Sequence, residues 1–229
     1  MTLDLIIISH AKTPELKAIT QRGIYTAIGN ENTVKVNPIV IEGNPNVTYD
    51  GAKTYYQSGE FNYNRFLNYG ASLGNSDYVC FANNDLVYGD DWAIKMINMM
   101  WWNELDSVSP YSHISHQIHK TGVEPNTGCI KGYKVKYQFE GWCFIWRREL
   151  WNEIKLDERV TFWCSDDATV EQLKAAKKSH AIVTHSFVEH PDNGGQTLRT
   201  APNRHELTIE QAKIFNTLYD KNIENVGKK

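Results

Sequence analysis

Residues 79–85 read Val-Cys-Phe-Ala-Asn-Asn-Asp, an apolar run that ends in two carboxamides and a carboxylate. Consecutive apolar side chains are typical of a strand that is buried on both faces of a sheet. Oxygen-bearing side chains at the end of such a strand can hold a hard divalent cation, and that cation can bind a diphosphate. Asp85 is therefore a candidate metal ligand, although an aspartate that only caps the following turn explains the same pattern.

Two earlier segments of the chain also have an apolar run followed by polar residues, and together with the first they predict the fold. Apolar strands are expected at 5–8, which ends at Ser9 and His10, and at 34–41, which ends at Glu42. Helical spacing is found between and after the strands, at 14–28, 60–74 and 90–102. The alternation of strands and helices predicts an α/β fold with a mostly parallel, Rossmann-like central sheet flanked by helices. The polar strand ends then share one edge, where parallel sheets bind their ligands.

The second half of the chain has a different character. We expect strands at 139–146 and 181–188, and helices at 147–154, 165–179 and 207–222. Ser165 is the predicted N-cap of the helix that carries Asp166 and Asp167 in its first turn. The segment 111–139 is rich in lysine and histidine, is interrupted by glycine, and is expected to form loops or short strands.

Composition limits the classes of protein that fit. The 229 residues are 41% hydrophobic with a net charge of −3, which predicts a soluble globule rather than a disordered chain or a wholly basic nucleic-acid binder. The four cysteines lack a C-x-x-C spacing and are expected to be reduced thiols in a cytoplasmic protein. No apolar run approaches the roughly 20 residues of a membrane span, and the N-terminus reads as a first strand rather than a signal peptide.

Three further features carry chemistry, each with a simpler structural explanation. Asp166 and Asp167 either favour the helix dipole or supply a general base. His190, ahead of the Gly194-Gly195 loop, is either a structural histidine or a metal ligand beside a lid. The seven tryptophans lie between Trp92 and Trp163. Most of them are expected in the core, and one or two can stack on a sugar ring or a base.

The order of these motifs resembles that of the family 2 inverting glycosyltransferases, which have the GT-A fold. The matching segments, spread over residues 4–198, are Asn68-Tyr69-Gly70, 76–85 (Ser-Asp-Tyr-Val-Cys-Phe-Ala-Asn-Asn-Asp), 141–149 (Gly-Trp-Cys-Phe-Ile-Trp-Arg-Arg-Glu), Asp166-Asp167 and 190–197 (His-Pro-Asp-Asn-Gly-Gly-Gln-Thr). The family usually has Asp-x-Asp where this chain has Asn83-Asn84-Asp85, and Glu-Asp where it has Asp166-Asp167. The first difference bears on metal affinity more than on the fold.

The resemblance implies a role for each matching residue. Asp85 and His190 would bind Mn²⁺ or Mg²⁺, and Asp167 would be the catalytic base with Asp166 beside it. The residues implied at the nucleotide sugar, a UDP sugar by expectation, are Ser9, His10, Glu42, Asn68, Asn83, Asn84 and Arg199. Residues 1–105 would then form the nucleotide-sugar half and 106–206 the acceptor-side and catalytic half of one GT-A domain. Residues 207–229 would form a C-terminal helix and tail.

The acceptor is left open by the sequence. A glycan is the usual acceptor of the family, whereas the basic segment 111–139 suits duplex DNA, for example hydroxymethylated cytosine in bacteriophage DNA. Two other functions also stay open. A sugar nucleotidyltransferase would need a glycine-rich loop that residues 9–27 lack. A catalytically inactive GT-A binding protein would tolerate the loss of a carboxylate at Asn83.

Overall fold

The structure is a computed structural model that describes residues 1–191 and 204–221. The strands are β1 (Thr2–Ser9), β2 (Lys35–Glu42), β3 (Lys53–Tyr56), β4 (Tyr78–Ala82), β5 (Val87–Tyr88), β6 (Ser107–Tyr111), β7 (Cys129–Lys131), β8 (Cys143–Arg147) and β9 (His180–Glu189). The helices are α1 (Pro14–Gly29), α2 (Tyr63–Ser72), α3 (Trp92–Trp102), α4 (His113–Ile118), α5 (Arg148–Glu153), α6 (Ser165–Ala175) and α8 (Arg204–Tyr219).

The strands of the described chain form one sheet in the order β3-β2-β1-β4-β8-β6-β9-β5, with β7 also paired to β9. Pairing is parallel among β3, β2, β1 and β4 and between β6 and β9. The pairings of β4 with β8, β8 with β6, and β9 with β5 and β7 are antiparallel. The predicted α/β fold with a central sheet is confirmed, but the sheet is mixed and its parallel part lies mainly in the first half of the chain.

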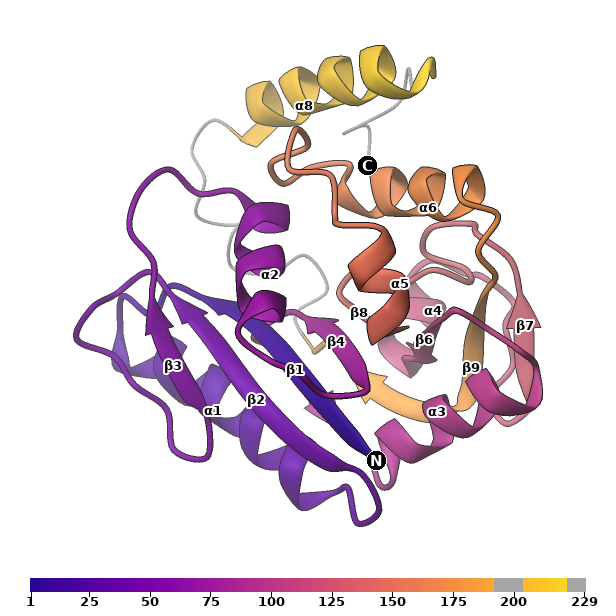
Figure 1. Ribbon diagram of the computed structural model, residues 1–229, viewed down its shortest axis with the longest axis horizontal. Helices are drawn as coiled ribbons and strands as arrows, with labels where there is room; N and C mark the ends of the chain where they lie inside the picture. Colours follow the sequence, from indigo (N-terminus) through magenta and orange to yellow (C-terminus); the bar gives the residue numbers. More distant parts are fainter. Residues whose placement is uncertain (192–203, 222–229) are drawn as a thin grey trace.

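Helices cover both faces of this sheet (Figure 1). Leu3, Leu5 and Ile7 of β1 belong to a core that includes residues of α1 and α3. Ile6, which alternates with them, belongs to a second core that includes residues of α2, α5 and α6. Because successive side chains of a strand point to opposite faces, the unbroken apolar run of β1 is what places a helical layer on each side.

The strand and helix predictions of the first half are confirmed within a few residues. Thr13 caps α1, and its hydroxyl oxygen accepts from the Leu16 N–H at 3.4 Å. Three short strands (β3, β5 and β6) and α4 were not predicted, because they have at most six residues and carry no clear periodicity, whereas β7 lies in the segment 111–139, where loops or short strands were expected. Strand β5 matters most among them, since it pairs with the end of β9 and brings the residues before and after it next to each other.

A buried ion pair joins the first half of β1 to the start of α5. The Asp4 carboxylate is 2% exposed and lies 2.5 Å from the Arg148 guanidinium. It also accepts from the Ser76 N–H and hydroxyl. These charge-assisted contacts hold α5 against the start of the sheet.

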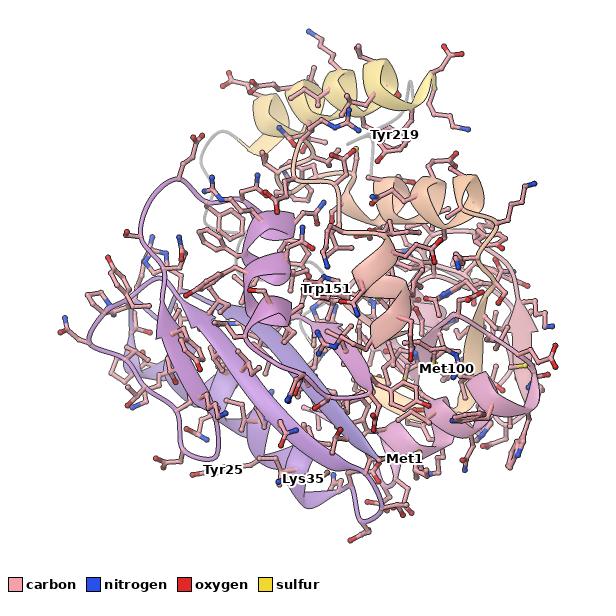
Figure 2. All side chains as sticks on the ribbon, in the orientation of Figure 1. Met1, Tyr25, Lys35, Met100, Trp151 and Tyr219 are labelled. Carbon is pink, nitrogen blue, oxygen red and sulfur yellow. The ribbon has the colours of Figure 1, made fainter. Side chains whose placement is uncertain are left out.

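Helix α8 packs beside α6 at one end of the molecule (Figure 1). Phe215 forms a small core with Val160 and Ala168. The hydroxyl of Tyr219, labelled in Figure 2, donates to Asp157 at 2.7 Å. None of the described helices is both long enough and apolar enough to cross a bilayer.

Candidate active site at the carboxyl ends of β4 and β9

Asp85 and His190 meet at the end of the sheet, although they are 105 positions apart. Asp85 follows β4 and His190 follows β9, and the antiparallel pairing of β5 with β9 holds the two segments together. Asp85 Oδ1 lies 3.0 Å from His190 Nε2, and both side chains are buried. The sequence prediction that these two residues share a site is consistent with this geometry.

No hydrogen bond joins the pair despite the short distance. Among the described residues, Asp85 Oδ1 and both ring nitrogens of His190 are buried atoms without a hydrogen-bond partner. Unpaired buried polar atoms are costly, so they point to a ligand that completes the site. A carboxylate oxygen and an imidazole nitrogen are suitable ligands for Mn²⁺.

The protein supplies only part of a metal coordination shell. In residues 1–191 and 204–221, no group of three or more His, Cys, Asp or Glu side chains is placed to hold a metal ion. A divalent cation at Asp85 and His190 would therefore take its other ligands from a bound diphosphate and from water, which is the usual mode for cations at nucleotide sites.

Asn83 and Asn84 face other partners. The Tyr63 hydroxyl donates to Asn83 Oδ1 at 2.9 Å, and the Asn83 N–H donates to the Trp142 carbonyl at 2.8 Å. The Asn84 amide donates to the Thr20 hydroxyl at 3.1 Å. Asp85 is therefore the carboxylate of this segment that meets His190, and the two asparagines tie the strand end to α2, β8 and α1.

Asp166 and Asp167 begin α6, but Ser165 does not cap this helix as predicted. The N-cap is Cys164, which has a left-handed backbone (φ 63°), and Ser165 is the first helical residue. The Ser165 hydroxyl donates instead to Asn64 Oδ1 of α2 at 2.6 Å. The prediction was wrong because a tertiary contact with α2 outcompetes the local cap.

The two aspartates differ in their surroundings. Burial and the neighbouring Asp167 raise the pKa of Asp166 to about 6, against the opposing charges of Lys136 and His190. Burial also raises the pKa of Asp167, and the charges that act on it are Lys136, Glu171 and Lys174. The electrostatic partners of Asp166 include a residue of the Asp85–His190 pair, whereas those of Asp167 lie on α6 and at Lys136.

Gly141 makes room for Asp166. A Cβ built on Gly141 would overlap the Asp166 carboxylate, so any larger residue at 141 would displace that side chain. The neighbouring Trp142 ring packs on His190 with the ring centroids 5.5 Å apart. The Gly141-Trp142 dipeptide therefore lies between the acidic start of α6 and the Asp85–His190 pair.

Sequence reasoning missed Glu140, which directly precedes that dipeptide. Its side chain is buried, accepts from the Ser115 hydroxyl at 3.3 Å and lies 3.8 Å from His116 Nε2. Burial raises the pKa of Glu140 to about 8, and the charge of Asp166 contributes to the rise. The available signal was an acidic residue in an apolar segment beside a functional glycine.

Three of the residues expected at the nucleotide, Ser9, His10 and Glu42, lie at the ends of β1 and β2. Glu42 is fully buried and accepts from the Ala11 N–H at 3.1 Å, the Asn44 N–H at 2.9 Å and the Tyr49 hydroxyl at 2.7 Å. The Ser9 and Tyr49 hydroxyl groups are 2.8 Å apart. Ser9 and Glu42 therefore shape the strand ends, and His10 is the exposed member of this group.

Asn68 lies inside α2 and holds a distant loop. Its amide donates to the Leu156 carbonyl and to the Glu158 carboxylate, both at 2.9 Å, and its oxygen accepts from Leu156 N–H. The Trp151 indole, which lies between α5 and α2 (Figure 2), donates to the same oxygen at 3.4 Å. In the structure Asn68 positions the chain that leads to α6. Arg199 lies outside the described residues.

The basic segment 111–139 folds around α4. Glu189, next to His190, accepts from the His113 ring at 2.7 Å and from the His113 and Ile114 N–H groups at the start of this helix. An open cavity of about 330 Å³ lies here, lined by Tyr111, His113, His116, Gln117, Lys120, Gly122, Val123 and Glu124. Its lining combines aromatic, basic and acidic side chains rather than a continuous basic surface.

Comparisons with known proteins support the fold. No family model matches the sequence, and no curated protein matches it. The fold is similar to that in the crystal structure of GalNAc-T7 with UDP, GalNAc and Mn²⁺, with a TM-score of 0.63 at 10% sequence identity. The match covers 82% of this chain and 43% of that chain, so this chain spans less than half the length of its neighbour. The likeness shows that the chain has the fold of a GT-A glycosyltransferase.

Proposed function

We propose that this chain is a metal-dependent glycosyltransferase that moves a sugar from a nucleoside-diphosphate sugar, of the UDP type, to an acceptor hydroxyl with inversion at the anomeric carbon. The observation that carries the proposal is the buried Asp85–His190 pair at the end of β4 and β9, whose facing atoms lie 3.0 Å apart without a hydrogen bond. The charge of His190 acts on Asp166, which places the acidic start of α6 near this pair. The UDP and Mn²⁺ in the GalNAc-T7 structure support the choice of donor and metal.

Asp85 and His190 would hold a divalent cation, which supplies charge neutralisation for the departing diphosphate. The pair is pre-positioned by the β5–β9 pairing and needs no rearrangement to bring the two ligands together. Its burial lowers the local dielectric, so the attraction for a cation that arrives with its diphosphate is stronger than at an exposed site.

The acidic start of α6 would provide the base. An acceptor hydroxyl loses its proton to an aspartate while its oxygen bonds to the anomeric carbon, and the bond from that carbon to the diphosphate breaks with its electron pair leaving on the diphosphate. With a pKa of about 6, Asp166 is ionised at neutral pH and still basic enough to take the proton. Attack on the face opposite the leaving group inverts the configuration.

The proposed roles of Asp166 and Asp167 follow from their neighbours. Asp167 is the base by family resemblance, whereas Asp166 has the charge interaction with His190. We therefore propose that Asp166 faces the donor and takes the proton, and that Asp167 raises its pKa. The nucleotide roles of Ser9, His10, Glu42, Asn68, Asn83, Asn84 and Arg199 stay predictions.

Thermal stability measured with UDP-, GDP- and TDP-sugars, each with and without Mn²⁺, tests the donor and the metal together. UDP with Mn²⁺ should raise the melting temperature of the wild type. Asp85→Ala and His190→Ala should remove the rise, whereas Asp90→Ala, which changes an exposed aspartate after β5, should keep it. Stabilisation by no nucleotide sugar would contradict the proposal.

Product analysis separates this function from its two alternatives. A glycosyltransferase releases UDP, and a sugar nucleotidyltransferase would instead release or consume pyrophosphate. An inactive binding protein would be stabilised by UDP and Mn²⁺ without any turnover. Proton NMR of the first product formed gives the anomeric configuration, and retention would contradict the single-displacement chemistry.

A further inference from the structure

One tight turn, formed by residues 140–143 (Glu-Gly-Trp-Cys), lies between the groups that the proposed reaction uses. Gly141 of this turn rests against the Asp166 carboxylate so closely that an added Cβ would overlap it. The ring of the next residue, Trp142, packs on His190 with the ring centroids 5.5 Å apart. The turn is therefore a spacer between the proposed base and one of the proposed metal ligands.

The two sides of this spacer are held in different ways. His190 is fixed beside Asp85 by the pairing of β5 with β9, to which the turn does not contribute. Asp166 lies in the first turn of α6, whose N-cap residue Cys164 makes no side-chain cap hydrogen bond within the described part of the chain. The 140–143 turn therefore sets how closely the Asp166 carboxylate approaches the metal ligands.

Glu140 anchors this turn through each of its polar groups. Its carbonyl accepts from the Cys143 N–H at 3.0 Å, and its own N–H donates to the Ser109 hydroxyl of β6 at 3.0 Å. Its carboxyl oxygens accept from the Ser115 hydroxyl of α4 at 3.3 and 3.5 Å. Because Glu140 is 1% exposed, its side chain has no free space in which to reorient, and loss of its contacts shifts the turn.

Titratable and charged groups face the Glu140 carboxyl from three segments, namely His116 of α4, Asp166 of α6 and Lys136 of the loop before the turn. Burial raises the pKa of Glu140 to about 8, and the charge of Asp166 adds to the rise while that of Lys136 opposes it. Burial also lowers the pKa of His116, so its 3.8 Å contact with Glu140 joins two neutral groups at pH 7. Between about pH 6 and pH 8, Asp166 is ionised while Glu140 keeps its proton.

We propose that Glu140 is a positioning residue for the transfer reaction, which through the 140–143 turn sets the Asp166 carboxylate at its working distance from the metal ligands. The inference rests on the proposed transferase function and adds to it a residue that touches neither donor nor acceptor. Misplacing a reacting group by about 1 Å can cost roughly 10²-fold in rate. Ionisation of Glu140 would also place a second negative charge near that of Asp166.

Two replacements of nearly equal size separate the hydrogen-bonding group from its volume. Glu140→Gln keeps a neutral hydrogen-bonding side chain, whereas Glu140→Met fills the same space without one. The matched control is Glu210→Met, which changes an exposed glutamate of α8. For each protein, kcat and KM are measured for release of UDP from a UDP sugar at saturating Mn²⁺ over a range of pH that extends to both sides of the Glu140 pKa. The rise in melting temperature with UDP and Mn²⁺ is recorded at pH 7.

At pH 7, Glu140→Met should lower kcat by about tenfold or more while the KM of the donor changes by less than about threefold, because only the placement of the base is lost. Its melting temperature should rise with UDP and Mn²⁺ as in the wild type, since the β5–β9 pairing still holds the metal ligands. Glu140→Gln and Glu210→Met should stay within about twofold of the wild type. The wild type should lose activity above about pH 8, and Glu140→Gln should lack this alkaline limb.

A wild-type kcat in Glu140→Met, or an alkaline limb that persists in Glu140→Gln, overturns the positioning role and leaves the transferase proposal standing. Loss of the UDP–Mn²⁺ stabilisation together with activity in Glu140→Met also overturns it, because the damage then reaches the metal ligands. If Glu140→Met does not fold, the alkaline limb of Glu140→Gln decides alone. A wild type that UDP and Mn²⁺ stabilise but that releases no UDP from any UDP sugar removes the transferase function, and with it the reaction that Glu140 would serve.

Discussion

Replacing Asp166 and Asp167 one at a time by asparagine separates the base from its neighbour. Loss of a general base costs about 10²–10⁴-fold in rate. Because Asp166 shares electrostatic interactions with His190 and Tyr63, we expect Asp166→Asn to cause a loss of this size in kcat/KM. Asp167→Asn should retain most of the activity, because the charges that act on Asp167 are those of Lys136, Glu171 and Lys174 rather than that of His190.

The pH profile of kcat/KM gives the magnitude, since it reports the ionisation of the free enzyme. The pKa of Asp166 is raised to about 6, so activity should fall on the acid side with a midpoint near pH 6. At pH 5 roughly a tenth of the plateau should remain, because one unit below its pKa only about that fraction of a carboxylic acid is ionised.

Two neighbours should move this midpoint in opposite directions. Asp167 raises the pKa of Asp166, so Asp167→Asn should shift the acid limb to lower pH. Lys136 lowers that pKa, so Lys136→Met should shift the limb to higher pH. The assay is release of UDP from a UDP sugar at subsaturating donor between pH 4.5 and 8. Full activity of Asp166→Asn with an unchanged acid limb would refute the assignment and return the role to Asp167.

Three further predictions concern stability. The pKa of Glu140 is raised from 4.5 to about 8 in the folded protein. Its contribution to the free energy of unfolding is therefore fully present below about pH 4.5, declines by up to about 1.4 kcal/mol per pH unit and is lost above pH 8. In urea titrations, Glu140→Gln should flatten this dependence of stability on pH. Gly70→Ala would press a Cβ against Ile6 of β1 and should lower the free energy of unfolding by about 1–3 kcal/mol. Gly29→Ala, which has open space around the new Cβ, should not destabilise the protein. Equal effects of the two substitutions would refute this packing argument. Arg148→Ala leaves Asp4 buried without its cation and should cost about 3–5 kcal/mol, and a loss below 1 kcal/mol would show that the carboxylate is solvated.

The strands and the ends of strands were predictable because they depend on local pattern. The apolar runs of β1, β2 and β4 are buried on both faces, so their length and their polar endings follow from burial alone. Asp85 and His190 were recognised from the order of motifs, and the β5–β9 pairing then brings them together. A two-residue strand such as β5 carries no periodicity from which it could be read.

The parts that escaped prediction depend on contacts between distant segments. Ser165 was predicted to cap α6, yet its hydroxyl donates a hydrogen bond to Asn64 of α2. Glu140 lay in a predicted strand without a chemical role, yet it is a buried carboxyl group that contacts Ser115 of α4. The ring contacts of Phe162 with Phe61 and Trp163 join residues about 100 positions apart, and neither Phe61 nor Trp163 is distinguished in the sequence from an aromatic residue of the core.

Asn83 stands where the resembling family usually has the first aspartate of Asp-x-Asp, and the electrostatics of the site explain why a neutral residue fits there. The site already gathers Asp85, Asp166 and Asp167, and a fourth negative charge at this position would raise the pKa of its neighbours further. The neutral amide oxygen of Asn83 still accepts a hydrogen bond from the Tyr63 hydroxyl at 2.9 Å, so the contact between the end of β4 and α2 is kept without that charge. The expected cost is weaker binding of a free cation, which the diphosphate of the donor offsets by supplying its own oxygens.

Asn83→Asp tests this balance. The added carboxylate should strengthen Mn²⁺ binding in the absence of nucleotide by about tenfold, measured by the loss of the free Mn²⁺ signal in electron paramagnetic resonance, and should have a smaller effect when UDP is present. It should also move the acid limb of kcat/KM to higher pH, because a further negative charge near Asp166 raises its pKa. An Asn83→Asp protein that binds free Mn²⁺ no better than the wild type would mean that this side chain does not reach the cation, and that the Tyr63 hydrogen bond alone determines its orientation.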